Sequence, residues 1–111
     1  YVFQQVPQLH LLSYCDLMIT SGGMNSIAEC IEKEVPMLVC PLSLKSDQLG
    51  NSARVVYHGL GLRARIKLDS SRTIEKRIVQ LFENYATFKR NLSMMRTKIL
   101  AESTAINTEV I

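Results

Sequence analysis

Short apolar runs alternate along the chain with stretches in which apolar residues recur every three or four positions. Residues 17–20 and 37–40 form continuous apolar runs, as is typical of parallel strands buried on both faces. Residues 62–68 alternate apolar with basic side chains, which predicts a half-exposed edge strand. Residues 1–3 predict one further, very short strand.

The periodic stretches predict helices over residues 24–33, 48–57, 72–84 and 85–103. Pro36 stops the first helix, and Gly59 supplies a left-handed cap for the second. Because strands and helices alternate, the strands should pair in parallel through right-handed crossovers, with helices on both faces. The sequence therefore predicts an α/β fold, a three-layer Rossmann-like parallel sheet of about four strands, with residues 1–111 as a single partial domain.

The last predicted helix carries an apolar stripe whose members are three and four positions apart: Tyr85, Phe88, Leu92, Met95 and Ile99. Such a stripe needs a surface to pack against. The surface is either the core of this domain, the interpretation we favour, or another domain.

The chain has 111 residues, of which 47% are hydrophobic and 21% are charged, the composition of one small globular domain. The net charge of +3 is uneven, since residues 1–44 contain one base and four acids, and residues 45–111 contain 12 bases and six acids. We interpret the basic half as a solvated helical surface. A nucleic-acid partner is disfavoured because no aromatic residue is interleaved among Arg63, Arg65 and Lys67.

Other sequence features bear on compartment and metal content. No apolar run approaches the ~18 residues of a transmembrane helix, and no signal peptide is visible. Cys15, Cys30 and Cys40 form no C-x-x-C pair and are predicted to be small buried hydrophobic residues in a reducing cytosol. His10 and His58 stand alone, so we expect no metal site. We expect a cytoplasmic protein, and the lack of an initiator Met suggests a fragment or a processed product.

Polar residues gather where the predicted strands end, in the segments 4–8, 21–29 and 41–48. Ligands of open parallel sheets bind at this edge. Ser21-Gly22-Gly23-Met24-Asn25-Ser26 joins a strand to a helix start, whose free N–H groups and positive dipole suit a phosphate. Glu29, one turn beyond Ser26, would suit ribose hydroxyls, and Asp47-Gln48 would suit sugar hydroxyls. The simpler alternative is that these polar residues only cap helices.

The order of these motifs resembles the donor-binding half of family 1 glycosyltransferases, the UDP-glycosyltransferases with the GT-B fold. The resemblance covers residues 1–62 or so, and it rests on Val6-Pro7-Gln8, the segment 21–26, Glu29, the segment 35–41 and Asp47-Gln48, followed by Asn51 and Arg54. It implies that the chain is half of a GT-B C-terminal domain. The final helix of the family often crosses back to the N-terminal domain, which would use the apolar stripe.

The resemblance also implies a role for each matching residue. Val6 and Gln8 would hold the nucleobase, Glu29 the ribose, and Asp47 and Gln48 the donor sugar. The turn and helix start would contact the diphosphate through Ser21, Gly22, Gly23, Asn25 and Ser26. Family members usually have His where this chain has Ser21, a shorter and neutral side chain, which predicts weaker phosphate binding or an altered donor.

The function expected from this resemblance is a C-terminal part of an inverting transferase. It would bind a UDP-sugar as co-substrate, without a cofactor, while a separate N-terminal domain supplies the acceptor site and the catalytic base. The chain alone should be inactive, and it could form a homodimer. Two alternatives stay open: a donor-binding subunit of a two-chain glycosyltransferase, and a non-catalytic module that retains the fold.

Overall fold

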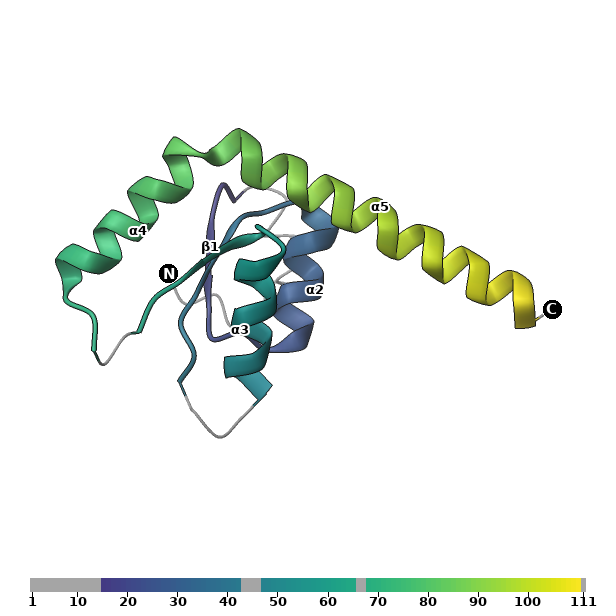
Figure 1. The fold of residues 1–111 in the computed structure, drawn as a ribbon, viewed down its shortest axis with the longest axis horizontal. Helices are drawn as coiled ribbons and strands as arrows, with labels where there is room; N and C mark the ends of the chain where they lie inside the picture. Colours follow the sequence, from purple (N-terminus) through teal and green to yellow (C-terminus); the bar gives the residue numbers. More distant parts are fainter. Residues whose placement is uncertain (1–14, 43–46, 66–67, 111) are drawn as a thin grey trace.

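The computed structural model describes residues 15–42, 47–65 and 68–110, with side chains up to residue 103. Three strands and four helices alternate along these residues (Figure 1). They are β1 (Met18–Thr20), α2 (Met24–Lys33), β2 (Met37–Val39), α3 (Asp47–Tyr57), β3 (Gly61–Arg63), α4 (Ser71–Glu83) and α5 (Tyr85–Val110). The α/β fold predicted from the sequence is confirmed.

The strands form one parallel sheet in the order β1-β2-β3. Thr20 pairs with Val39, and Val39 pairs with Arg63, so the three strands end level with one another. The predicted strand at residues 1–3 lies outside the described residues, which contribute three strands rather than about four. The level strand ends bring the loops that follow them to one edge.

The edge strand is shorter than predicted. β3 ends at Arg63, and the predicted strand continued to Leu68. Instead the N–H groups of Leu68 and Asp69 both donate to the carbonyl of Arg65 and close a turn. Leu68 is 75% exposed, so it does not share the buried face of Ala64, as the alternation had predicted.

Helices pack on both faces of the sheet at β2, which confirms the three layers, whereas β1 is not buried on both faces as predicted, since Ile19 is 55% exposed. Met37 and Val39 pack in one cluster with residues of α2, α3 and α5. Leu38 and Cys40 pack in a second cluster, which contains Leu81 of α4. Successive side chains of a strand point to opposite faces, so β2 reads as a continuous apolar run because it has a helical layer on each side.

The helix ends agree with their capping residues. α2 ends at Lys33, and its C-cap Glu34 takes a left-handed conformation with φ of 55°, two positions before Pro36. Gly59 follows α3 with φ of 67°, as predicted. The hydroxyl of Ser70 accepts from the N–H of Thr73, 3.2 Å away, at the start of α4. α5 continues to Val110, beyond the predicted end at residue 103.

The apolar stripe of α5 packs mostly on the body of this domain. Leu92 is fully buried in the α2-side cluster, where Met95 also packs, and Phe88 contacts the α4-side cluster. Ile99 is 45% exposed, and Figure 1 shows α5 running on past the sheet and its helices. The core interpretation therefore holds for the first part of the stripe and not for its last member.

Two of the three cysteines are buried, and the third is exposed. Cys30 and Cys40 are buried as predicted, whereas Cys15 is exposed because it precedes β1 and lies outside the core. None of the helices in the described part of the chain is long and apolar enough to cross a membrane.

Candidate functional site

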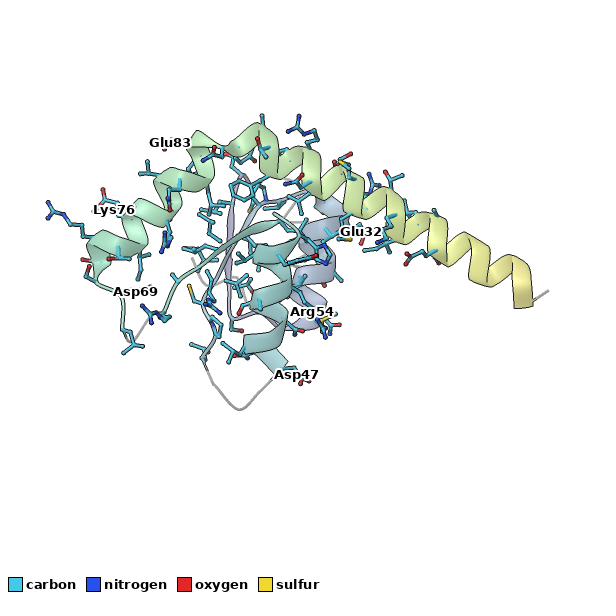
Figure 2. The ribbon with its side chains drawn as sticks, in the orientation of Figure 1. Glu32, Asp47, Arg54, Asp69, Lys76 and Glu83 are labelled. Carbon is cyan, nitrogen blue, oxygen red and sulfur yellow. The ribbon has the colours of Figure 1, made fainter. Side chains whose placement is uncertain are left out.

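The candidate site lies at the edge of the sheet where the strands end. α2 and α3 both begin there, after β1 and β2 respectively. Figure 2 shows Asp47 at this end of the helical layer and Glu32 at the opposite end. The predicted loops 21–29 and 41–48 therefore reach the same edge, although residues 43–46 are not described.

The Gly22-Gly23 turn is held tightly from two sides. Gly22 has a φ of 94°, a conformation that side chains other than glycine rarely adopt. Its N–H donates to the Thr20 hydroxyl oxygen over 3.3 Å, and its carbonyl accepts from the Asn51 side-chain amide over 3.0 Å. A Cβ at Gly22 would lie 2.9 Å from a methyl carbon of Val39. The turn therefore requires glycine at position 22.

The start of α2 is open toward solvent. Gly23 is its N-cap and provides no side chain to accept from the first turn. The carbonyl of Gly23 accepts from the N–H of Ile27, the first bond of the helix ladder that starts at this cap. A Cβ built at Gly23 would meet nothing within 4 Å. This helix end has the N–H groups and the positive dipole that an anion needs.

The side chains that follow the turn are accessible. Asn25 is exposed, and Ser26 and Glu29 are half-buried on one face of α2. Ser21 is half-buried beside them. The structure thus places the predicted phosphate-contacting and ribose-contacting residues in the turn and in α2, where all of them except the buried Gly22 are at least partly accessible.

The start of α3 lies against this turn. Asp47 is exposed in the first turn of α3, and Gln48 is half-buried. The backbone of Gln48 is next to Gly22, since a Cβ at Gly22 would lie 3.3 Å from the Gln48 carbonyl oxygen. The Gln48 side-chain oxygen accepts from the N–H of Leu42 over 3.0 Å and so fixes the loop after β2. The Gln48 side chain is therefore engaged within the protein.

No role was predicted from the sequence for two of the residues that build the site, although Asn51 belongs to the motif that carries the family resemblance. Asn51 and Thr20 hold the Gly22 turn, and both are buried. Asn51 could have been noticed as a polar residue on the inward face of its helix, next to the buried Val55. Val6 and Gln8, the predicted nucleobase contacts, lie outside the described residues. His58 is exposed at the other end of α3.

Thiol and metal chemistry are not favoured by the described side chains. Burial raises the pKa of the Cys40 thiol, and the Asp69 carboxylate raises it further, so this thiol at the end of β2 is a poor nucleophile. No three His, Cys, Asp or Glu residues among those that the structure describes are grouped to hold a metal ion. The arrangement is suited to binding a polar, anionic ligand.

Comparison with known proteins agrees with this geometry. A sequence model of the family "UDP-glucoronosyl and UDP-glucosyl transferase" matches residues 1–102. The chain belongs to this family. It is 34% identical, over 90% of its length, to a zeaxanthin glucosyltransferase of Pantoea ananas, of which it covers 22%. It is 35% identical, over 71% of its length, to human UDP-glucuronosyltransferase 3A1, of which it covers 15%.

Solved structures of GT-B glycosyltransferases extend the match to the fold. The glycosyltransferase of kitacinnamycin superposes with a TM-score of 0.80 at 33% identity, over 91% of this chain and 26% of that one. The chain thus spans between 15% and 26% of the length of these three proteins. Its sheet and helices are a Rossmann-like part of a GT-B domain.

Proposed function

We propose that this member of the family supplies the donor half-site of a glycosyltransferase that moves a hexose from a UDP-sugar to an acceptor hydroxyl. The observation that carries the proposal is the clamped Gly22-Gly23 turn, which opens α2 at the carboxyl edge of the sheet beside the start of α3. The names of the glucosyl- and glucuronosyltransferase relatives support a hexose donor.

In this proposal the diphosphate sits at the start of α2. The N–H groups of the first turn donate to its oxygens, with Ser21, Asn25 and Ser26 adding side-chain donors. Glu29 accepts from the ribose hydroxyls one turn further along. Asp47 accepts from hydroxyls of the hexose, and the neighbouring Gln48 side-chain amide also contacts these hydroxyls. Val6 and Gln8 contact the base.

The chemical contribution of these residues is to stabilise the departing diphosphate. Negative charge grows on the leaving group as the glycosidic bond breaks, and helix N–H groups aimed at it lower the barrier. Attack by a deprotonated acceptor on the opposite side of the sugar would invert the anomeric centre. The base that deprotonates the acceptor is not assigned to these 111 residues, so the chain alone transfers no sugar in this proposal. No cofactor or metal has a role in it.

Titration of the 111-residue chain with UDP and UDP-glucose, followed by amide shifts in NMR spectra, tests the proposal. We expect shifts in residues 21–29 and 47–48, and uridine should shift fewer of them. Glu29→Gln should weaken UDP binding, and the matched variant Glu32→Gln, at the far end of the same helix, should not. Asp47→Asn should weaken UDP-glucose more than UDP. A folded chain with no shifts at millimolar UDP would contradict the proposal.

A further inference from the structure

Asn51 is a buried polar residue in the interior of α3, with 5% of its surface exposed. Its side-chain nitrogen donates to the Gly22 carbonyl, 29 positions away in sequence. A buried amide is costly unless it is paired, and this bond pairs it. The bond connects α3, which carries Asp47, to the turn that opens α2.

The direction of the bond determines where the next N–H points. In a trans peptide the carbonyl and the following N–H point in opposite directions. The Gly22 carbonyl points inward to Asn51, so the N–H of Gly23 points away from Asn51. The Thr20 hydroxyl holds the preceding N–H, that of Gly22. The Gly22–Gly23 peptide is thus fixed with its donor outward.

The alternative orientation of this peptide would be unfavourable for an anion. A flipped peptide would direct the carbonyl oxygen outward, where it would repel a diphosphate. Glycine on both sides makes such a flip sterically accessible. Asn51 opposes it because the flip would leave its buried amide without an acceptor.

We infer that Asn51 is a positioning residue for the diphosphate. It keeps the Gly23 N–H turned outward, as a further donor beside the first turn of α2, without touching the ligand itself. The inference rests on the proposed function and extends it from the residues that face the donor to one that sets their orientation.

Asn51→Asp tests the inference with little change of shape, because it replaces the amide donor with a carboxylate that the Gly22 carbonyl repels. Asn51→Ala is a second variant in case the aspartate variant does not fold. Ser52→Ala is the matched control. Ser52 is the next residue of α3 and fully buried, but its hydroxyl donates to the carbonyl of Leu49 within its own helix.

Two readouts are compared: the amide signals of Gly22 and Gly23 without ligand, and the affinities for UDP and for uridine. In the Asn51 variants we expect displaced or broadened signals and a loss of UDP affinity of about tenfold, the size expected for one hydrogen bond, with uridine affinity changed about twofold or less. Ser52→Ala should leave the glycine signals and both affinities near those of the wild type.

Unchanged glycine signals in the Asn51 variants would overturn the inference. Equal losses for UDP and uridine would overturn it too, since they would indicate general loosening of the domain. A wild-type chain that binds no UDP would refute the proposed function, and the inference with it. That failure is recognisable because it appears before any substitution is made.

Discussion

The sheet has a closed edge, where the strands begin, and an open edge, where the strands end. The two differ in how side chains pair the backbone polar groups. At the edge where the strands begin, α5 crosses the molecule and donates to three carbonyls. Tyr85 bonds to Asp16 over 2.8 Å, Lys89 to Glu34 over 2.7 Å, and Asn91 to Gly59 over 3.0 Å. At the edge where the strands end, α2 begins with a glycine cap that has no side chain.

The difference follows the direction of the helix dipoles. α2 and α3 direct their negative ends to the first edge, where Lys89 and Arg96 stand near Glu34 at the end of α2. Their positive ends point to the second edge. The chain therefore neutralises one edge with its own side chains and presents the other with the polarity that suits an anion. The stable edge and the proposed binding edge are built from the same two helices.

The largest loss of stability is expected from removing the packing of α5 at the closed edge. Leu92 is fully buried, so Leu92→Ala should destabilise the domain by about 2–5 kcal/mol through lost burial and a cavity. Met94→Ala is the control, because Met94 is 64% exposed on the same helix and should change stability by about 0.5 kcal/mol or less. Chemical denaturation measures both. Equal effects would mean that α5 does not hold this edge.

One methyl group added to the Gly22 turn should disrupt the open edge. Gly22→Ala forces alanine into a φ of 94° and against Val39, which should cost about 1–3 kcal/mol and remove UDP binding. Gly23→Ala is the matched change, with φ of −67° and open space, and should alter stability by only about 0.5 kcal/mol. Denaturation and NMR titration of both variants test this. Comparable losses of stability would contradict the role assigned to the conformation of Gly22.

A smaller effect is expected from removing the donors of the closed edge singly. Lys89→Met and Asn91→Ala should each destabilise the domain by about 0.5–1.5 kcal/mol, the usual worth of one hydrogen bond. Lys98→Met serves as control, since Lys98 is exposed further along α5. Thermal unfolding of the three variants distinguishes specific bonds from loss of a surface charge. If Lys98→Met destabilised the domain as much as the other two variants, the bonds to Glu34 and Gly59 would not account for the loss of stability.

Local sequence patterns were sufficient to predict most of the fold. The predicted helix over residues 24–33 agrees with α2, because one apolar face and Pro36 define both its orientation and its end. The parallel sheet followed from the apolar runs of β1 and β2. The end of β3 was not predictable from alternation, because the turn that closes it depends on Asp69 and on the bond from Leu68 to Arg65.

The candidate site was predicted in part. The glycine turn and Asp47 could be assigned to one edge, since parallel strands bring their carboxyl ends together. Asn51 belongs to the motif behind the family resemblance, but its role could not be predicted. Its bond to Gly22 depends on how α3 packs against the turn, and no local sequence pattern records that packing. The roles of the residues along the turn and α2 remain predictions that binding experiments must decide.

The smallest change in stability is expected at the turn after β3, where the Asp69 carboxylate accepts a hydrogen bond from the backbone. The Arg65 N–H donates to Asp69 over 2.8 Å, and this bond, with the nearby Arg65 guanidinium, lowers the pKa of the Asp69 carboxyl. A lowered pKa in the folded state stabilises the fold at pH values above the ordinary pKa of about 4, and the contribution is lost as the pH falls through the folded value.

Asp69→Asn keeps the shape and an acceptor for the Arg65 N–H but removes the charge. Its denaturation midpoint should therefore lie slightly below that of the wild type at pH 7, and the two should converge as the pH is lowered past the folded pKa. Urea titrations of both proteins across this range measure the gap. A gap between the two midpoints that stays constant with pH would show that the Asp69 charge contributes nothing to the stability of the domain.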